Sequence, residues 1–268
     1  MSDRMPVLFV SHGAPTLPFD DVPARRYLIE LARKVPRPKA ILCISAHWEA
    51  AAPSLTASPQ PGTIHDFSGF PKALYELTYD APGAPEVAER ATALLRAAGY
   101  HPNLDTERGR DHGAWVPAML AWPAGEVPVI QLSLLRGQST HAHIKLGEAI
   151  APLRDEGVLI LGSGGSVHNL RQVSWDGGRT PRWATEFQEW LDQSLAANDL
   201  AALTGYRAKL DVAQMAHPTE DHLMPLYVAL GAGHSDGGAD KLHGSFTLGS
   251  LGMASYGWGC SGEGHAAL

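Results

Sequence analysis

Two apolar segments of this chain end in a histidine, although an apolar run of this kind is typical of a buried strand. The segment PVLFVSHGAP carries His12 two residues beyond its apolar run, and AILCISAHWEA carries His47 in the same position. A third segment, GVLILGSGGSVHNL, brings His168 after a glycine-rich stretch. Imidazole is a common ligand of zinc, iron and copper, and it is the usual general base near neutral pH. These three positions are therefore candidates for metal or proton-transfer chemistry.

The elements that must position these histidines are strands and helices in alternation. Nearly continuous runs of Val, Ile and Leu are typical of strands that are covered on both faces of a parallel sheet, and they occupy 6–10, 40–45, 127–134 and 157–164. Apolar residues at helical spacing lie between and after them, at 25–35, 85–99, 141–154, 180–199 and 222–233.

This alternation predicts an α/β fold with a central, largely parallel or mixed sheet that is flanked by helices. We find no linker that would divide the chain, so we expect one domain over residues 1–268, with 260–268 as a flexible tail. The segment 245–258 has strand-forming residues that are interrupted by glycines, and we expect it to add one or two edge strands.

The three histidines should meet at one edge of this sheet. Ligands of open α/β sheets bind outside the carboxyl ends of the strands, and right-handed crossovers keep those ends at the same edge. A single histidine is more often an inert, hydrogen-bonded residue of the core or of a loop. Three histidines at equivalent strand ends, His12, His47 and His168, indicate instead a metal centre at the carboxyl ends of the strands.

Two further segments compete for a place in this centre. RGRDHGAWVP, which we expect to be a glycine-flanked loop, contains Asp111 and His112. AHPTEDHLMP, at the start of a helix, contains several metal-ligand types: His217, Glu220, Asp221 and His222. Negative charge at a helix N-terminus is a sufficient explanation for the two carboxylates, but it does not explain His222.

The remaining histidines divide into an aromatic loop and a scattered set. TIHDFSGFP places His65 beside Asp66 in a loop that either walls an aromatic substrate or packs on the surface. His141 and His143 lie two residues apart on an expected helix and do not share a face. We expect no catalytic role for them, nor for His101, His234, His243 and His265.

Composition narrows the class of partner. The formal net charge of −7 argues against nucleic-acid binding, which depends on lysine and arginine to neutralise phosphates. We expect no membrane association either, because there is no basic amphipathic stretch, no apolar run of spanning length and no signal-peptide pattern. Two cysteines cannot form a disulfide framework, which favours a cytoplasmic location.

Seven motifs taken together resemble a known family. In chain order they are SHGAP, SAHWE, TIHDFSGFPKALYEL, YDAPG, DHGAWVP, SGGSVHNL and HPTEDHLMPLYVALGA. This ordered set, from about residue 6 to the final strands, resembles the class III extradiol ring-cleavage dioxygenases of the 4,5-DOPA dioxygenase branch. The resemblance implies one Fe(II) or Zn(II) per chain, with a small aromatic diol and O₂ as substrates.

The resemblance also implies roles for individual residues. His12, His47 and His222 match the metal ligands, and His168 matches a catalytic acid/base or, within the same branch, a fourth ligand. His112 matches a histidine that contacts either a metal ligand or the substrate, and we count it with His168 among the expected catalytic residues. More distant relatives complete the site with a glutamate. If the register were shifted, the third ligand here would be a carboxylate from the same motif, Glu220 or Asp221.

The expected function is metal-dependent insertion of O₂ into a DOPA-like catechol, with cleavage to a semialdehyde. His168 would accept and return a proton, His112 and His65 would hydrogen-bond the substrate, and aromatic side chains would wall its ring: Trp48, Phe67 and Phe70. The alternatives are a zinc-dependent hydrolase and a non-enzymatic binding protein on the same fold. His168 argues against the binding protein, since such a protein needs no proton shuttle.

Overall fold

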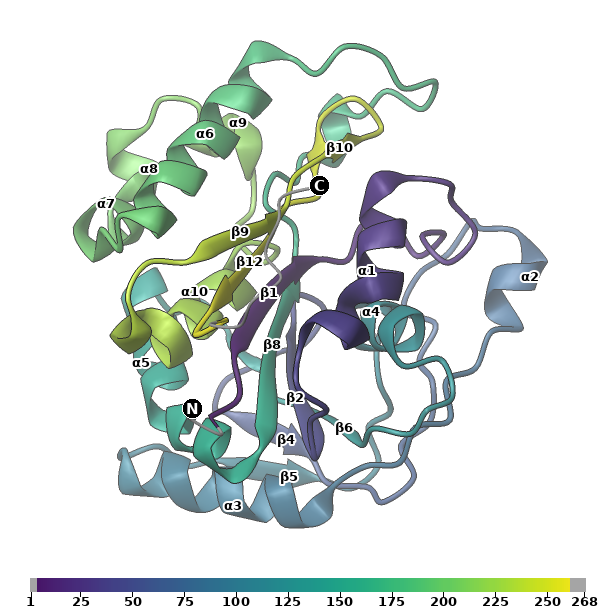
Figure 1. Ribbon diagram of the computed structural model, residues 1–268, viewed down its shortest axis with the longest axis vertical. Helices are drawn as coiled ribbons and strands as arrows, with labels where there is room; N and C mark the ends of the chain where they lie inside the picture. The colour runs from purple at the N-terminus through teal and green to yellow at the C-terminus, as the bar shows by residue number, and fades with distance from the viewer. Residues whose placement is uncertain (1–3, 261–268) are drawn as a thin grey trace.

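The computed structural model of the protein describes residues 4–260. A mixed sheet of six strands forms its centre (Figure 1). The strand order is β6-β2-β8-β1-β12-β9. The first four strands are parallel, and β12 runs antiparallel to both β1 and β9. The strands span β1 (Val7–Ser11), β2 (Ala40–Ser45), β6 (Val129–Gln131), β8 (Val158–Gly164), β9 (Asp240–His243) and β12 (Ser255–Trp258).

Three strand pairs lie outside this sheet. Two are parallel: β3 (Glu49–Ala50) with β7 (Leu134–Leu135), which follow β2 and β6 in the chain, and β4 (Ser54–Thr56) with β5 (Asn103–Asp105). The third pair is antiparallel, β10 (Phe246–Thr247) with β11 (Leu251–Gly252). Because β3 follows His47 almost directly, it carries the chain away from the edge where the histidines were expected.

Helices cover both faces of the central sheet (Figure 1). α1 (Pro23–Lys34) and α4 (His112–Ala121) pack on one face, and α5 (Thr140–Ile150) and α10 (Met224–Gly233) lie on the other. The remaining α-helices are α2 (Lys72–Tyr75), α3 (Pro85–Ala97), α6 (Arg182–Ala196), α7 (Leu200–Thr204), α8 (Tyr206–Lys209) and α9 (Ala213–Ala216). Short 3₁₀ helices span Ala151–Glu156, Leu170–Gln172 and His234–Asp236.

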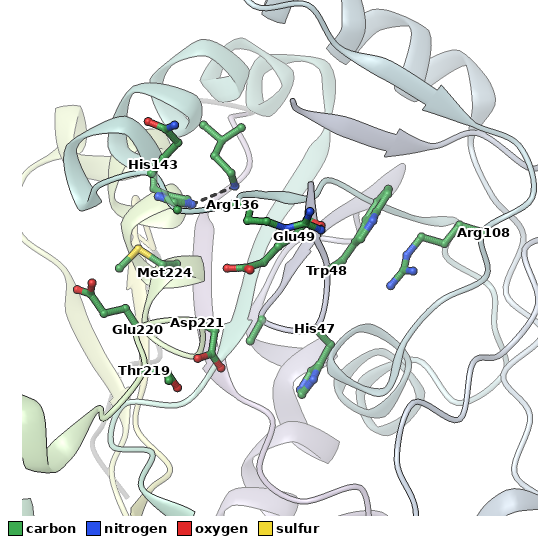
Figure 2. A pocket seen from close by; sticks show the side chains of 14 residues that line it. His47, Trp48, Glu49, Arg108, Arg136, His143, Thr219, Glu220, Asp221 and Met224 are labelled. Atoms are coloured by element: carbon green, nitrogen blue, oxygen red, sulfur yellow. Dashed lines mark hydrogen bonds between the residues drawn. The ribbon is translucent and has the colours of Figure 1, made fainter. Parts of the chain in front are cut away.

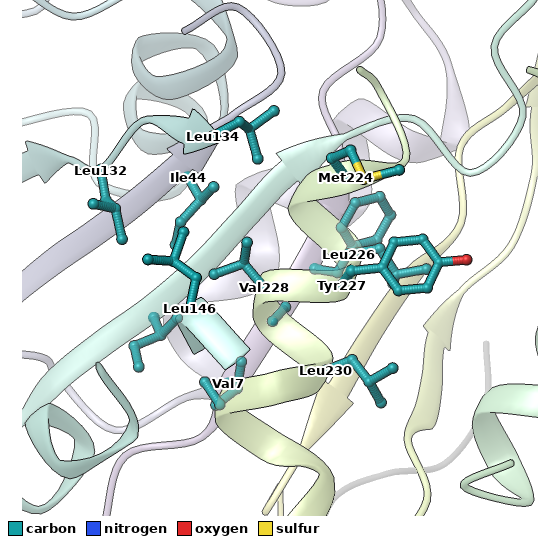
Figure 3. Close-up of a cluster of buried hydrophobic side chains, with 14 of the residues drawn as sticks. Val7, Ile44, Leu132, Leu134, Leu146, Met224, Leu226, Tyr227, Val228 and Leu230 are labelled. Atoms are coloured by element: carbon teal, nitrogen blue, oxygen red, sulfur yellow. The ribbon is translucent and has the colours of Figure 1, made fainter. Parts of the chain in front are cut away.

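The alternation of side chains along buried strands builds a core on each face. In β1, Val7 and Phe9 point to the side of α10, whereas Leu8 and Val10 point to the side of α1 and α4. All ten residues of α10 are buried, because the helix is enclosed by the sheet and by α5 (Figure 3). The turn that precedes α10 is therefore anchored on a rigid block at the edge of the sheet.

The predicted fold class is confirmed, and strands β1, β2 and β8 coincide closely with their apolar runs. The predicted strand over 127–134 is too long. The chain leaves the sheet after Gln131, and Leu134–Leu135 pair with β3 instead. The expectation of edge strands from the tail is wrong for β12, which is paired on both sides, while β9 forms the edge.

The segment that contains Asp111 and His112 is also different from the expectation. It is not a loop, because α4 begins at His112 and continues through Pro117. Its glycine and proline suggested a turn, but its apolar side chains are buried against the sheet and hold it in a helix. The boundaries of the single domain stay a prediction. Residues 261–268, which include His265 and most of the expected tail, lie outside the described part of the chain.

No helix within residues 4–260 is both long enough and apolar enough to cross a membrane.

Candidate metal centre

Imidazoles from three distant parts of the chain converge at the carboxyl edge of the sheet. His12 and His47 follow β1 and β2, and their Nε2 atoms lie 3.0 Å apart. His222 enters from the turn before α10, with its ring centroid 5.5 Å from that of His12 and 4.9 Å from that of His47. One ring nitrogen from each residue lies within 4.8 Å of the others, so these three nitrogens could hold one metal ion.

The hydrogen bonds of His12 determine which of its nitrogens is free. The Ser163 hydroxyl donates to the carbonyl oxygen of Gly113, so it can only accept from His12 Nδ1, which lies 3.1 Å away. His12 Nδ1 therefore carries the proton, and Nε2 is left with a lone pair. Metal-bound histidines are oriented in this way, by a hydrogen bond from the nitrogen that does not bind the metal.

His47 and His222 are arranged in the same way by carboxylates. His47 Nδ1 faces Asp66 Oδ2 at 3.6 Å, and His222 Nδ1 donates to Asp221. Each carboxylate favours a proton on Nδ1 and a lone pair on Nε2. The lone pairs of His12 and His47 then face each other at 3.0 Å, an arrangement that repels in isolation and that a cation between them would stabilise.

Burial keeps the imidazoles of His12 and His47 neutral. Loss of solvation, reinforced by the neighbouring histidines, lowers the pKa of His47 to about 2 and holds the pKa of His12 well below its usual value. Metal ligands must be deprotonated, and buried imidazoles of this kind are ready to bind a cation at neutral pH.

Asp66 also positions His112 beside this group. Its Oδ2 accepts from His112 Nδ1 at 2.9 Å, and its Oδ1 accepts from the His112 backbone N–H, also at 2.9 Å. Burial alone would raise the pKa of Asp66, but the hydrogen bonds from His112 outweigh burial and lower the pKa to about 2. The His112 ring lies 4.0 Å from that of His47. His47, Asp66 and His112 form a second set of residues that could hold a metal.

His168 reaches the same region from the loop after β8. Its ring stacks on His222, with centroids 3.5 Å apart and planes 5° apart. Its backbone N–H donates to the carbonyl of Ala216, which fixes the loop on the segment before His222. Burial and the nearby His222 lower the pKa of His168 to about 3, so the ring is neutral at neutral pH.

Two glycines allow the elements of the site to approach this closely. A Cβ atom on Gly113 would lie 2.2 Å from Ser45 Oγ and 3.1 Å from His47 Cδ2. A Cβ atom on Gly164 would lie 2.0 Å from the carbonyl oxygen of His222. Any side chain at these positions would push α4 or the His222 turn away from the histidines.

A cavity of about 760 Å³ opens beside the centre (Figure 2). His47, Trp48 and Asp221 line it next to the histidines, together with Met224 at the start of α10. The guanidinium carbon of Arg108 lies 4.6 Å from the centre of the Trp48 ring. Trp48, a predicted substrate contact, therefore presents a ring at the cavity.

Three other predicted substrate contacts, His65, Phe67 and Phe70, belong to an aromatic cluster rather than to the lining of this cavity. His65 Nε2 donates to the carbonyl of Leu77 at 2.9 Å, and its ring lies 5.7 Å from that of Phe67. Phe70 packs on Phe67 at 5.5 Å, and Phe67 in turn lies 5.7 Å from His112. Phe67 thus lies between His112 and both His65 and Phe70, and the roles of these residues stay predictions.

Two orienting residues, Ser163 and Asp66, were not identified from the sequence as partners of the ligands. Ser163 lies inside an apolar strand and gave no signal, whereas Asp66 could have been suspected because it follows His65 in a loop. Glu220 and Asp221, the alternative third ligands, are engaged elsewhere. Glu220 accepts from Tyr206 at 2.8 Å, and neither carboxylate belongs to a metal-binding set within residues 4–260.

Comparison with known proteins defines the class to which this chain belongs. Residues 7–259 match the family described as the catalytic LigB subunit of aromatic ring-opening dioxygenase. The chain belongs to this family, and the predicted resemblance and enzyme class are confirmed. Membership in the family implies a metal cofactor, and the converging imidazole nitrogens fit one.

Individual relatives cover nearly all of the chain. The 4,5-DOPA dioxygenase extradiol of Beta vulgaris is 41% identical over 252 residues, which cover 92% of this chain and 94% of the relative. The protein of the same name from Escherichia coli K12 is 39% identical over 236 residues, with 86% of each chain covered. The crystal structure of an uncharacterized Escherichia coli K12 protein superposes with a TM-score of 0.80 at 33% identity, covering 96% of this chain and 100% of that one.

Proposed function

We propose that this protein cleaves the aromatic ring of a DOPA-like catechol by extradiol insertion of O₂, yielding a semialdehyde, and that His12, His47 and His222 hold one Fe(II). The observation that supports this most strongly is the convergence of one ring nitrogen from each of these three histidines, with Nδ1 of His12 bonded to Ser163, Nδ1 of His222 bonded to Asp221, and Nδ1 of His47 facing Asp66 at 3.6 Å. The printed names of the relatives from Beta vulgaris and Escherichia coli support the DOPA-like substrate.

Three imidazoles suit either iron or zinc, and the chemistry decides between them. A metal held by three side chains keeps positions open for other ligands. When bound, it acidifies the diol and brings O₂ next to the ring. Reaction with O₂ requires a metal that changes its redox state, which zinc does not do. We therefore propose Fe(II) as the active metal.

His168 and His112 supply the proton transfer and the positioning. His168, neutral and stacked on His222, accepts a proton from a diol hydroxyl and returns one as the ring opens. His112 Nε2, oriented through Nδ1 by Asp66, accepts a hydrogen bond from the substrate. In the same proposal Trp48 packs against the ring, while His65 and Phe70 act from the aromatic cluster behind His112.

The state of the two cysteines supports a proposal for the cellular compartment of the protein. Cys43 is buried and Cys260 is partly buried, and neither forms a disulfide within residues 4–260. Free thiols of this kind are typical of a reducing compartment, and we propose the cytoplasm.

One reconstitution experiment tests the proposed function. The metal-free protein is loaded anaerobically with Fe(II) or with Zn(II), a panel of catechols is added, and O₂ consumption and semialdehyde absorbance are followed. We expect uptake with iron and none with zinc, and no uptake in a His222→Ala protein. If iron gives no uptake with any catechol, the proposal fails. Metal-dependent ester or amide hydrolysis by the zinc form would then favour a hydrolase, which the three-histidine donor set also fits.

A further inference from the structure

The cavity beside the histidines contains more charged groups than ring cleavage requires, and most of them are already engaged by the protein. Arg108 donates to the buried carboxylate of Asp111 at 3.2 Å, so its charge is compensated. Glu220 accepts from the Tyr206 hydroxyl, and Asp221 accepts from His222. These side chains have structural partners and are not free to bind a charged ligand.

Arg136 and Glu49 are different. Glu49 is the first residue of β3, and Arg136 directly follows β7, the strand that pairs with β3. Arg136 Nη2 donates to the backbone carbonyl of Glu49 at 3.0 Å. Neither side chain forms an ion pair with any residue between 4 and 260. Figure 2 shows both in the middle of the cavity wall, between His143 and His47. A cation and an anion thus stand on one wall without neutralising each other.

We propose that Arg136 and Glu49 form a subsite for the zwitterionic end of an amino-acid catechol, with Arg136 binding the carboxylate and Glu49 the ammonium group. The planar guanidinium matches a carboxylate in a two-point hydrogen bond, and a glutamate is the natural partner of an ammonium ion. This subsite rests on the proposed ring-cleavage function, for which it defines the side chain of the substrate.

The subsite lies close to His47, both along the chain and in the cavity. Glu49 follows His47 by two residues, so their Cα atoms lie no more than about 7 Å apart. His47, Glu49 and Arg136 also line the same cavity. A substrate whose diol lies at His47 would therefore reach Glu49 and Arg136 with its charged end.

A cycle of two variants and four substrates tests the subsite. Arg136→Gln and Glu49→Gln are compared with the wild type on L-DOPA, on dopamine, on 3-(3,4-dihydroxyphenyl)propionate and on 4-methylcatechol. We expect Arg136→Gln to lower kcat/KM about tenfold more for the two substrates with a carboxylate than for the other two. Glu49→Gln should do the same for the two substrates with an ammonium group. Arg182→Gln, which removes an exposed cation far along the chain, serves as the charge control.

The outcomes separate the subsite from the function on which it rests. Equal losses on all four substrates in both variants would overturn the subsite while leaving ring cleavage intact. If the wild type cleaves none of the substrates, the proposed function fails, and calorimetric binding of L-tyrosine then tests the subsite alone. We expect Arg136→Gln to weaken that binding about tenfold, and unchanged affinity would overturn the subsite.

Discussion

Two groups of buried or half-buried histidines in this protein use their nitrogens differently. His143, in α5, is satisfied on both sides: Nδ1 donates to the Ser139 carbonyl at 2.9 Å, and Nε2 accepts the Leu135 backbone N–H at 3.1 Å. In the proposed metal-site histidines (His12, His47 and His222), Nδ1 faces Ser163 or a carboxylate, and one ring nitrogen from each residue lies within 4.8 Å of the others.

This difference shows which property marks a functional histidine. Burial lowers the pKa of His143, as it lowers those of His12 and His47, so a lowered pKa does not separate the two groups. The separating feature is the partner of Nε2, which is a backbone N–H in His143 but the Nε2 atom of the other imidazole in His12 and His47. His143 links α5 to β7 through its hydrogen bonds, whereas each proposed metal-site histidine has one ring nitrogen that is available to bind a metal ion.

Removing one metal-site histidine is the change with the largest expected effect. We expect His12→Ala, His47→Ala or His222→Ala to lose the metal and to lower ring-cleavage activity by at least about a thousandfold, since the open-shell chemistry depends on the ion. Metal content by mass spectrometry and O₂ uptake are the measurements.

His143→Gln is the matched control. It should retain the metal and lose only about 1–3 kcal/mol of stability, because it breaks satisfied hydrogen bonds. Loss of metal from this variant, or full metal content in His12→Ala, would break the comparison.

His168→Gln should have the next largest effect. As an acid/base, its loss lowers kcat by about 10²- to 10⁴-fold and leaves the metal content unchanged. If His168 is instead a fourth ligand, the variant loses metal after gentle purification, and the content of the purified protein decides between these roles.

Asp66→Asn should have a smaller effect. Asp66 lies 3.6 Å from His47 Nδ1 and holds His112, so an amide in its place weakens the orientation of both rings. Partners of metal ligands typically contribute about 10- to 100-fold in metal affinity. Competition with a chelator for Fe(II) measures this metal affinity. An unchanged affinity would show that Asp66 only accepts hydrogen bonds at the start of α4 and does not orient a metal ligand.

The smallest expected effect concerns the stability of the metal-free protein at low pH. Burial lowers the pKa of His168 to about 3, whereas the same imidazole titrates near 6.5 in the unfolded chain. Between these values the unfolded state binds more protons, so the free energy of unfolding falls as the pH decreases below about 6.5. The slope contributed by one such group is at most about 1.4 kcal/mol per pH unit.

Urea unfolding between pH 5 and 7.5 measures that slope. His168→Gln, which does not titrate, should flatten the dependence relative to the wild type. An identical dependence in the two proteins would show that the His168 ring is not held neutral by the fold.

Local patterns predicted much of the fold and part of the centre. The apolar runs of β1 and β2 and the rule for parallel strands were sufficient to place His12 and His47 at one edge. From the residues alone, the third strand-end histidine was His168, because nothing local shows which side chains of an edge point to a common centre. The assignment of His222 came from the family resemblance.

The parts that were not predicted depend on tertiary contacts. His222 reaches the centre because its turn packs against the bare backbone of Gly164. Asp66 becomes a partner of His112 only because α4 begins there, in a segment whose glycine and proline indicated a loop. Such contacts join residues that are far apart in sequence, and the hydrophobic periodicity of a single segment does not predict them.

The most direct test is an anomalous diffraction experiment at the iron edge on crystals loaded anaerobically with Fe(II). We expect a single peak about 2.1 Å from the Nε2 atoms of His12, His47 and His222. A peak between His47, Asp66 and His112, the second set of residues that could hold a metal, would contradict the proposed centre.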